Sequence, residues 1–223
     1  ENQKSMVTVS WLLPENNDPT LTFSLQMLGY ILLGTPASPL RKALIDSGLG
    51  EDVIGAGMDD SLRQLYFSAG LKGVAPSDVD KVEQLILSTL EGLARDGIDP
   101  DMVEAALNTI EFGLREQNYG SMPRGLVLMI AALTTWLHDG DPIAPLAFEA
   151  SLTEIKTQLA REGSRYFEDL IAAHLLQNSH RLTFALEPDT ELQQKQEAAE
   201  RARLEEVRAS LDEQGLQATI EQT

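Results

Sequence analysis

The sequence predicts an α+β domain in which helices pack on one face of a mainly antiparallel sheet, followed by a C-terminal helical arm. Two strand-like runs joined by a turn at 52–74 predict an antiparallel hairpin. Helical spacing then dominates from 77 to 178, and a strand pattern returns at 180–188. Strands grouped apart from a run of helices favour this class over alternating α/β units.

The first expected strand covers residues 6–15, "MVTVSWLLPE". Val7, Val9 and Trp11 alternate with their neighbours, so they share one face of that strand. Proline lacks a backbone N–H and interrupts a strand ladder, and we therefore expect the strand to stop at Pro14.

Two helices led by proline are expected next. Asp18 is a suitable N-cap and Pro19 suits the first helical position, so a buried apolar helix is expected over 21–33, ended by Gly34. The stretch "TPASPLRKALIDSG" repeats these signals in a shorter helix. The residues that cap, open and close that helix are Ser38, Pro39 and Gly48.

Apolar periodicity defines the rest of the domain. In the second strand of the hairpin the alternating residues are Leu65, Phe67, Ala69 and Leu71. The helices expected after it cover about 77–96, 100–114, 125–136, 145–161 and 164–178. The composition changes after Pro188, and we divide the chain into a domain at 1–188 and an arm at 189–223.

The arm is rich in Glu, Gln, Ala and Arg, which indicates a solvated helix or half of a helical hairpin. From Glu187 onward it holds 10 acidic and 4 basic residues. The chain starts with "ENQKSM", without an initiator Met or a signal pattern, and it ends in polar helical sequence. We therefore expect a piece of a longer chain.

Composition argues against several classes of function. A formal net charge of −18 repels nucleic acid and anionic lipid, and charge of this sign would steer basic peptides toward the chain. The chain has no cysteine, so disulfides and cysteine-bound metals are excluded. The longest apolar run, "GLVLMIAAL" at 125–133, is too short to cross a bilayer. We expect a soluble chain with no membrane contact, and the cytoplasm is the favoured compartment.

Three histidines are available for chemistry. His138 with Asp139 and Asp141 could form a metal site, but adjacent side chains on a turn seldom converge with a third ligand, and a cation at a helix end already favours the dipole. His174 has the setting of a helix-surface or core histidine. His180 lies six residues later, whereas a helical zinc pair needs three or four. A shared metal is therefore not expected.

Motifs of nucleophilic or phosphate chemistry are absent from the sequence: there is no Gly-x-Ser-x-Gly, no Gly-x-x-x-x-Gly-Lys and no dinucleotide fingerprint. The acid pairs Asp59–Asp60 and Asp99/Asp101 could serve acid–base chemistry. Their positions at a turn and at a helix start instead favour solvated caps. Taken by themselves, the residues predict no catalytic residue and no metal site.

Several motifs in order give a resemblance to a known family. The segments "VSWLLPE", "LLGTPASPLRKALIDSGLGED", "YFSAGLKGV", "WLHDGDP" and "HRLTFALEPD" resemble the second domain of pitrilysin/insulinase-type zinc metallopeptidases, in the presequence-protease branch. The resemblance covers residues 6 to about 190. The arm resembles the start of the helical hairpin that links the two halves of such enzymes.

The resemblance implies that the zinc chemistry belongs to another domain of the parent chain. The first domain of such an enzyme carries His-x-x-Glu-His on a helix, where two His bind zinc and the Glu activates its water. Setting the turn after that helix against "LGT" at 33–35 puts Leu25 and Gly29 at the histidine positions and Leu28 at the glutamate position. We therefore expect Leu25 and Leu28 to point into a packed interior, with no cofactor in this chain.

The implied function is that of a non-catalytic structural domain of a zinc-dependent endopeptidase that degrades unstructured peptides in a closed chamber. It would form chamber wall and pass to the second half through the arm. Its partners would be other domains of the same chain and the peptide substrates of the parent. The alternative is a free-standing inactive peptidase-like protein that binds a partner through its acidic arm.

Overall fold

The computed structural model describes residues 5–212 and 214–215, and the chain divides into two compact units. The first unit, Glu1–Leu186, contains the sheet and the helices packed on it. The second unit, Glu187–Thr223, contains α8 (Leu192–Ser210). What each of the two predicted parts, 1–188 and 189–223, does in a longer chain stays a prediction.

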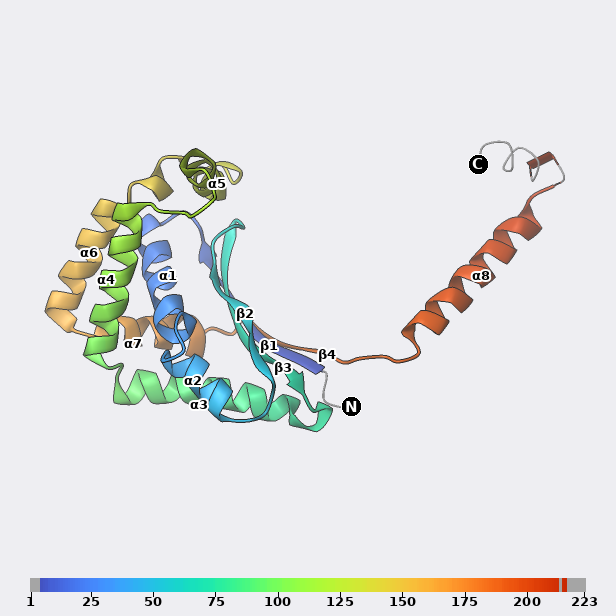
Figure 1. Ribbon diagram of the computed structural model, residues 1–223, viewed down its shortest axis with the longest axis horizontal. Helices are drawn as coiled ribbons and strands as arrows, with labels where there is room; N and C mark the ends of the chain where they lie inside the picture. The colour runs from blue at the N-terminus through green and yellow to red at the C-terminus, as the bar shows by residue number, and fades with distance from the viewer. Residues whose placement is uncertain (1–4, 213, 216–223) are drawn as a thin grey trace. The chain divides into compact units, whose positions relative to one another are not determined.

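The sheet of the first unit has four strands in the described part of the chain, in the order β2-β3-β1-β4, and every neighbouring pair is antiparallel. These strands are β1 (Ser5–Glu15), β2 (Asp52–Asp59), β3 (Gln64–Val74) and β4 (Arg181–Leu186). Figure 1 shows the helices of this unit gathered on one side of the sheet. The predicted α+β class is confirmed.

The central strand β1 carries the predicted buried row. Val7, Val9 and Trp11 are fully buried, because the strand's even spacing directs all three toward the helices. The predicted end at Pro14 is wrong, since β1 continues through Pro14 to Glu15. Because Pro14 has no N–H to donate, it interrupts the pairing with β3 instead, and the register shifts between Leu12 and Glu15.

The helices of the first unit follow the predicted order. They are α1 (Pro19–Leu33), α2 (Pro39–Asp46), α3 (Val79–Asp96), α4 (Pro100–Glu116), α5 (Arg124–Trp136), α6 (Phe148–Glu162) and α7 (Arg165–Ile171). The predicted caps of α1 are confirmed, because Asp18 accepts hydrogen bonds from the N–H groups of Thr20 and Leu21, each at 3.0 Å. Gly34 follows the last residue of α1 as its C-cap.

Ser38 does not cap α2 in the predicted way. It holds the N-cap position, but its hydroxyl makes no bond to the first turn of that helix. The Oγ atom instead accepts from the N–H of Thr35 at 3.0 Å and donates to the carbonyl of Tyr30 at 3.3 Å. Ser38 therefore closes the turn back onto the end of α1, which fixes the angle between the two helices.

The helix predicted at 164–178 is present, but only its first part, α7, is α-helical. The chain passes from α7 into a π-helical segment, Ala172–Leu176. Within it, the carbonyl of Leu175 accepts a 2.7 Å hydrogen bond from the indole N–H of Trp11. Widened π turns leave carbonyls that point away from the regular ladder, and here one of them satisfies a buried donor on the sheet.

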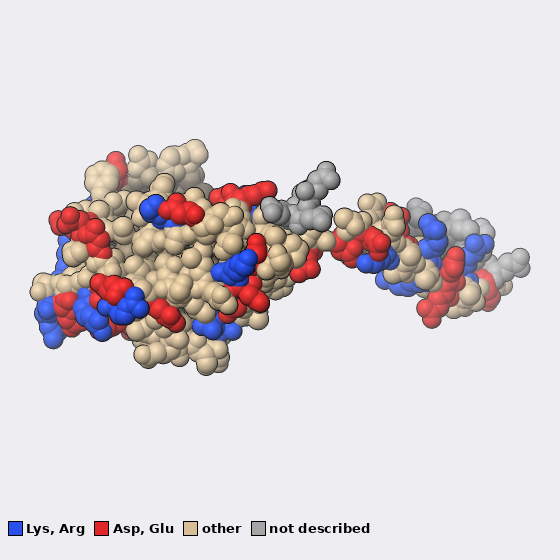
Figure 2. Space-filling view, turned by 90° about the horizontal axis from the view of Figure 1, so that it is seen from below, with Lys and Arg blue, Asp and Glu red and all other residues tan. Residues whose placement is uncertain are grey.

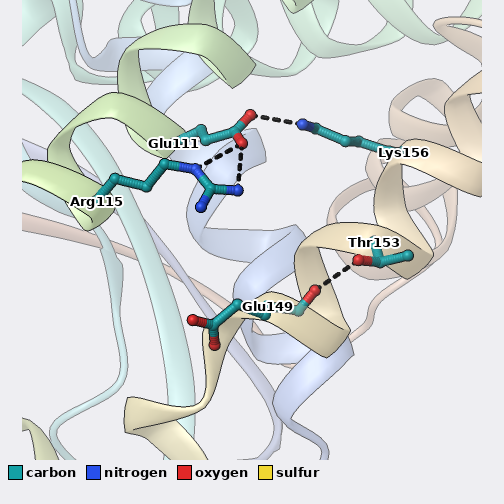
Figure 3. A network of polar contacts seen from close by, with 5 residues as sticks. All are labelled: Glu111, Arg115, Glu149, Thr153 and Lys156. Carbon is teal, nitrogen blue, oxygen red and sulfur yellow. Dashed lines mark hydrogen bonds and ion pairs between the residues drawn. The ribbon is translucent and has the colours of Figure 1, made fainter.

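Polar contacts on the outside of the helical layer connect α4 to α6. Figure 3 shows Glu111 of α4 between Arg115 of the same helix and Lys156 of α6. The hydrogen bonds from Lys156 and Arg115 hold the pKa of Glu111 below its ordinary value. The contact between Glu149 and Thr153 in the same figure lies within α6, where the threonine hydroxyl donates to the glutamate's backbone carbonyl.

Candidate functional site

The segment of α1 at the predicted zinc-motif positions is packed into the core. Leu25 is 3% exposed and Leu28 is 2% exposed, and both belong to the buried apolar cluster. Burial of each leucine contributes about 1.5 to 3 kcal/mol. Apolar side chains at these two positions stabilise the helix against the sheet, and they offer no atom that could bind a metal or move a proton.

Gly29, the third of these positions, faces the backbone of β2. A Cβ atom added there would lie 2.9 Å from the Cβ of Met58 and 3.3 Å from its backbone nitrogen. Distances below 3.0 Å require something to move, and the atoms to be moved belong to a strand of the sheet. The close approach of α1 to β2 therefore excludes any larger side chain at this position without displacement of β2.

The polar side chains of α1 have structural partners. Ser24 donates to the carbonyl of Thr20 at 2.7 Å, and its oxygen lies 2.7 Å from the hydroxyl of Tyr166 on α7. Gln26 donates through Nε2 to Asp60 at 2.8 Å. These contacts connect α1 to α7 and to the turn between β2 and β3.

The metal site considered for His138, Asp139 and Asp141 does not form. His138 lies 3.4 Å from the carbonyl of Ser61, and Asp139 forms an ion pair with Arg63 at 3.0 Å. Asp141 accepts from the N–H of Ile143. The three side chains thus have separate partners, and no group of three or more His, Cys, Asp or Glu residues converges on a point within 5–212 and 214–215.

His174 and His180 occupy different surroundings. His174 lies in the π-helical segment, where partial burial lowers its pKa. His180 is exposed in the loop before β4, and its carbonyl accepts from the N–H of Leu12 at 3.0 Å. Neither histidine is brought to a second candidate ligand within the described residues.

The two acid pairs differ. Asp99 accepts from the N–H of Asp101 at 3.0 Å and caps α4, as predicted. Asp59 accepts from the N–H and the hydroxyl of Ser61 in the β2–β3 turn. Asp60 differs from the expected solvated cap, because it is half-buried and burial raises the pKa of its carboxyl group.

Asp60 belongs to a cavity of about 340 Å³ between α1, α5, α6 and the β2–β3 turn. Phe23 and Phe148 line its wall, and Asp141 is a second carboxylate on the lining. Sequence reasoning missed this cavity, because its lining comes from segments spread between residues 16 and 151. No local spacing connects such residues, so only the tertiary fold identifies them as one site.

Surface charge does not single out a second site. On the face seen in Figure 2, acidic and basic side chains are interspersed with uncharged ones. The ion pairs Lys42–Asp46 and Arg95–Asp96 are both largely exposed, and pairs of this kind contribute little to stability. No helix in the described ranges has the length and apolar character needed to cross a membrane.

Several known proteins are similar to this chain in sequence. The family model described as "Peptidase M16 inactive domain" matches residues 1–110. Presequence protease 1, chloroplastic/mitochondrial, of Arabidopsis thaliana is 47% identical over 96% of this chain. Protein HypA of Clostridium perfringens and the mitochondrial presequence protease of Mus musculus are each 35% identical, over 99% and 92% of the chain. The chain spans about a fifth of the length of these relatives, with 20%, 22% and 19% covered.

Solved structures share the fold. The inactive peptidase domain of a Bordetella parapertussis protein superposes with a TM-score of 0.66 at 21% identity, over 85% of this chain and 93% of that one. The peptidase M16 inactive domain from Pseudomonas fluorescens gives a TM-score of 0.57 at 14% identity, over 84% of this chain and 41% of that one. The arrangement of helices on an antiparallel sheet is therefore shared with these two structures.

Proposed function

We propose that this chain, whose residues 1–110 match the family model of the peptidase M16 inactive domain, is a non-catalytic structural domain of a zinc-dependent metalloendopeptidase that degrades unstructured peptides in a closed chamber. In this proposal the first unit forms part of the chamber wall. The arm at 189–223 passes to the other half of the enzyme. The zinc and the residues that bind it belong to a separate domain of the parent chain.

The observation that carries the proposal is the packing of α1 into the core. Leu25 and Leu28 are buried apolar residues, and Gly29 lies against β2 with no room for a side chain. At these three positions α1 contributes to core packing and provides no side chain that could bind zinc. Equivalence of these positions to the His-x-x-Glu-His motif of a catalytic M16 domain is part of the proposal.

Exposed apolar surface supports contact with other domains. On α5 four large apolar side chains are 41% to 62% exposed: Leu126, Met129, Ile130 and Trp136. On the edge strand β4, Leu182, Phe184 and Leu186 are each more than half exposed. Apolar patches of this kind commonly mark interaction surfaces. In the parent enzyme, patches of this kind would face neighbouring domains or the peptide chamber.

The arm supports a linking role through its sequence and its helix. All described side chains of α8 are exposed within its own unit, and Leu204 and Val207 stand one turn apart on it. A single solvated helix with an apolar stripe gains stability from a partner helix. We propose that a following segment of the parent chain supplies that helix.

The proposal leads to a test in the intact parent enzyme. Replacing residues 192–210 with a Gly/Ser segment of equal length is expected to reduce peptide cleavage by about tenfold or more, because a flexible linker no longer holds the two halves in register. Zinc content is expected to stay at the level of the unmodified enzyme, since no ligand lies in the replaced helix. Cleavage and zinc are measured on the same samples.

A control for this replacement keeps the helix and changes only exposed polar side chains. Gln194→Ala and Gln196→Ala favour helix formation, and neither removes a hydrogen bond or ion pair seen in α8. Both variants should cleave peptide at the unmodified rate. Unchanged cleavage after the Gly/Ser replacement itself would contradict the linking role.

The free-standing alternative is weakened by the charge of the arm. The helix α8 carries four acidic and four basic side chains, so the acidic excess lies in the residues that flank it. The helix α8 itself therefore has no net charge with which to attract a basic partner. Detection of a 24.5 kDa polypeptide in the source cells would nevertheless favour the alternative over a domain of a longer enzyme.

The compartment stays a prediction. The curated relatives include proteins whose names place them in mitochondria or chloroplasts. If the parent enzyme acts on peptides in such an organelle, the sign of the net charge, −18, suits basic peptide substrates.

A further inference from the structure

The cavity that contains Asp60 has a composition suited to a cation. Its lining includes two carboxylates, Asp60 and Asp141, and no Lys, Arg or His side chain. One oxygen of Asp60 accepts from Gln26 at 2.8 Å, and a carboxylate has capacity for further donors. Partial burial strengthens the attraction between this carboxylate and a cationic group, because less water screens it.

The same cavity carries aromatic and aliphatic surface. Phe23 of α1 and Phe148 at the start of α6 line it, together with apolar side chains from the neighbouring segments. Those side chains are Pro19, Leu114, Ala131, Ala144, Pro145 and Ala147. A ligand with a long apolar stem and a planar cationic head would contact the aliphatic wall with its stem, and its head could stack on an aromatic ring.

Hydrogen bonds within the protein hold the polar rim in place. Asn16 donates to the carbonyls of Asp60 and Thr134, and it accepts from Thr22. Thr135 donates to the carbonyl of Asp141 at 2.8 Å. These bonds connect the β2–β3 turn to α5 and hold the backbone of Asp60 and Asp141 without using a cation from the chain itself.

We propose that this cavity binds the side chain of an arginine in a peptide held by the domain. The assignment rests on the proposed function for the peptide, and on charge complementarity for the arginine. The guanidinium group would donate to Asp60, and its methylene stem would lie along the apolar wall. A volume of about 340 Å³ is at the lower end of the range for ligand cavities and is ample for one side chain.

The test is an NMR titration of the 223-residue chain with two blocked pentapeptides. One has alanines around a central arginine, and the other has citrulline in its place, which keeps the shape and removes the charge. The arginine peptide should bind about tenfold more tightly or better, as expected for a charge-assisted hydrogen bond in a partly buried site. Shifts should centre on the amides of Asp60, Thr135 and Gly140, which line the cavity.

Variants distinguish binding in the cavity from non-specific attraction of a cationic peptide to a negatively charged protein. Asp60→Asn keeps an acceptor for Gln26 and should abolish the preference for arginine over citrulline. Asp139→Asn removes the same charge from an exposed neighbour whose φ of 68° asparagine tolerates, and it should leave the preference intact. Ala131→Phe places a large side chain on the cavity wall and should abolish binding even where the charge is unchanged.

Three results would overturn the assignment: equal affinity for the two peptides, an arginine preference that survives Asp60→Asn, or shifts centred outside the cavity. Free arginine that binds as tightly as the peptide would overturn the peptide as occupant. These measurements need no catalysis. The arginine site can therefore be disproved without disproving the structural role. That role is tested by peptide cleavage after replacement of α8 in the parent enzyme.

Discussion

Introducing His, Glu and His at positions 25, 28 and 29 is expected to unfold the first unit without creating a zinc site. Leu25 and Leu28 are 3% and 2% exposed, so the triple variant would bury an imidazole and a carboxyl group among apolar side chains. Histidine at Gly29 would also need β2 to move away from α1. Together these changes should cost about 5 kcal/mol or more, which approaches the whole stability of a typical domain.

The measurement is urea denaturation of the triple variant with and without one equivalent of zinc. Leu25→Met and Leu28→Met serve as controls, because volume-conserving replacements should each cost less than about 1.5 kcal/mol. Zinc should not raise the denaturation midpoint of the triple variant. A folded triple variant that binds one zinc and is stabilised by it would show that the helix keeps the geometry of an active site.

Replacing Trp11 with alanine is expected to have the next largest effect, a loss of about 3 to 5 kcal/mol. The side chain is fully buried at the centre of the sheet, and its ring centroid lies 5.8 Å from that of Phe67. Its indole N–H satisfies the carbonyl of Leu175 in the π-helical segment. The variant would therefore open a cavity and also leave a buried carbonyl without its donor.

The free energy of unfolding in urea checks this expectation. Trp11→Phe separates the two contributions, because it keeps most of the ring packing and removes only the donor, at an expected cost of about 1 to 3 kcal/mol. In Trp11→Ala, amide exchange should speed up most across residues 172–176. A loss below about 1 kcal/mol for Trp11→Ala would mean that the sheet and the π-helical segment are not coupled through this residue.

Much of the fold could be predicted from short-range signals. Asp18 with Pro19 and Asp99 with Pro100 mark helix starts, because capping and a fixed proline φ act within a few residues. The alternation at Val7, Val9 and Trp11 predicts the buried face of β1, because alternate residues of a strand point to the same side. The α+β class and the hairpin of β2 and β3 follow once these elements are placed.

The errors arose where a distant contact decides the conformation. Ser38 has the residue type and position of a cap, yet the carbonyl of Tyr30 lies close enough to take its hydroxyl. The π-helical segment at 172–176 contacts Trp11, which lies 164 residues earlier in the sequence. Asp60 is half-buried only because α1 and α5 close over the β2–β3 turn. Sequence spacing carries none of this information.

The most direct test of the central proposal is zinc content measured together with hydrolysis of an unstructured peptide, on the untagged 223-residue chain given one equivalent of zinc. An inert structural domain should retain no zinc after dialysis and should leave the peptide intact. The zinc chemistry then belongs to another domain of the parent enzyme. One tightly held zinc per chain with peptide cleavage would contradict the proposal, and would mean that Leu25, Leu28 and Gly29 are not the counterparts of the zinc motif.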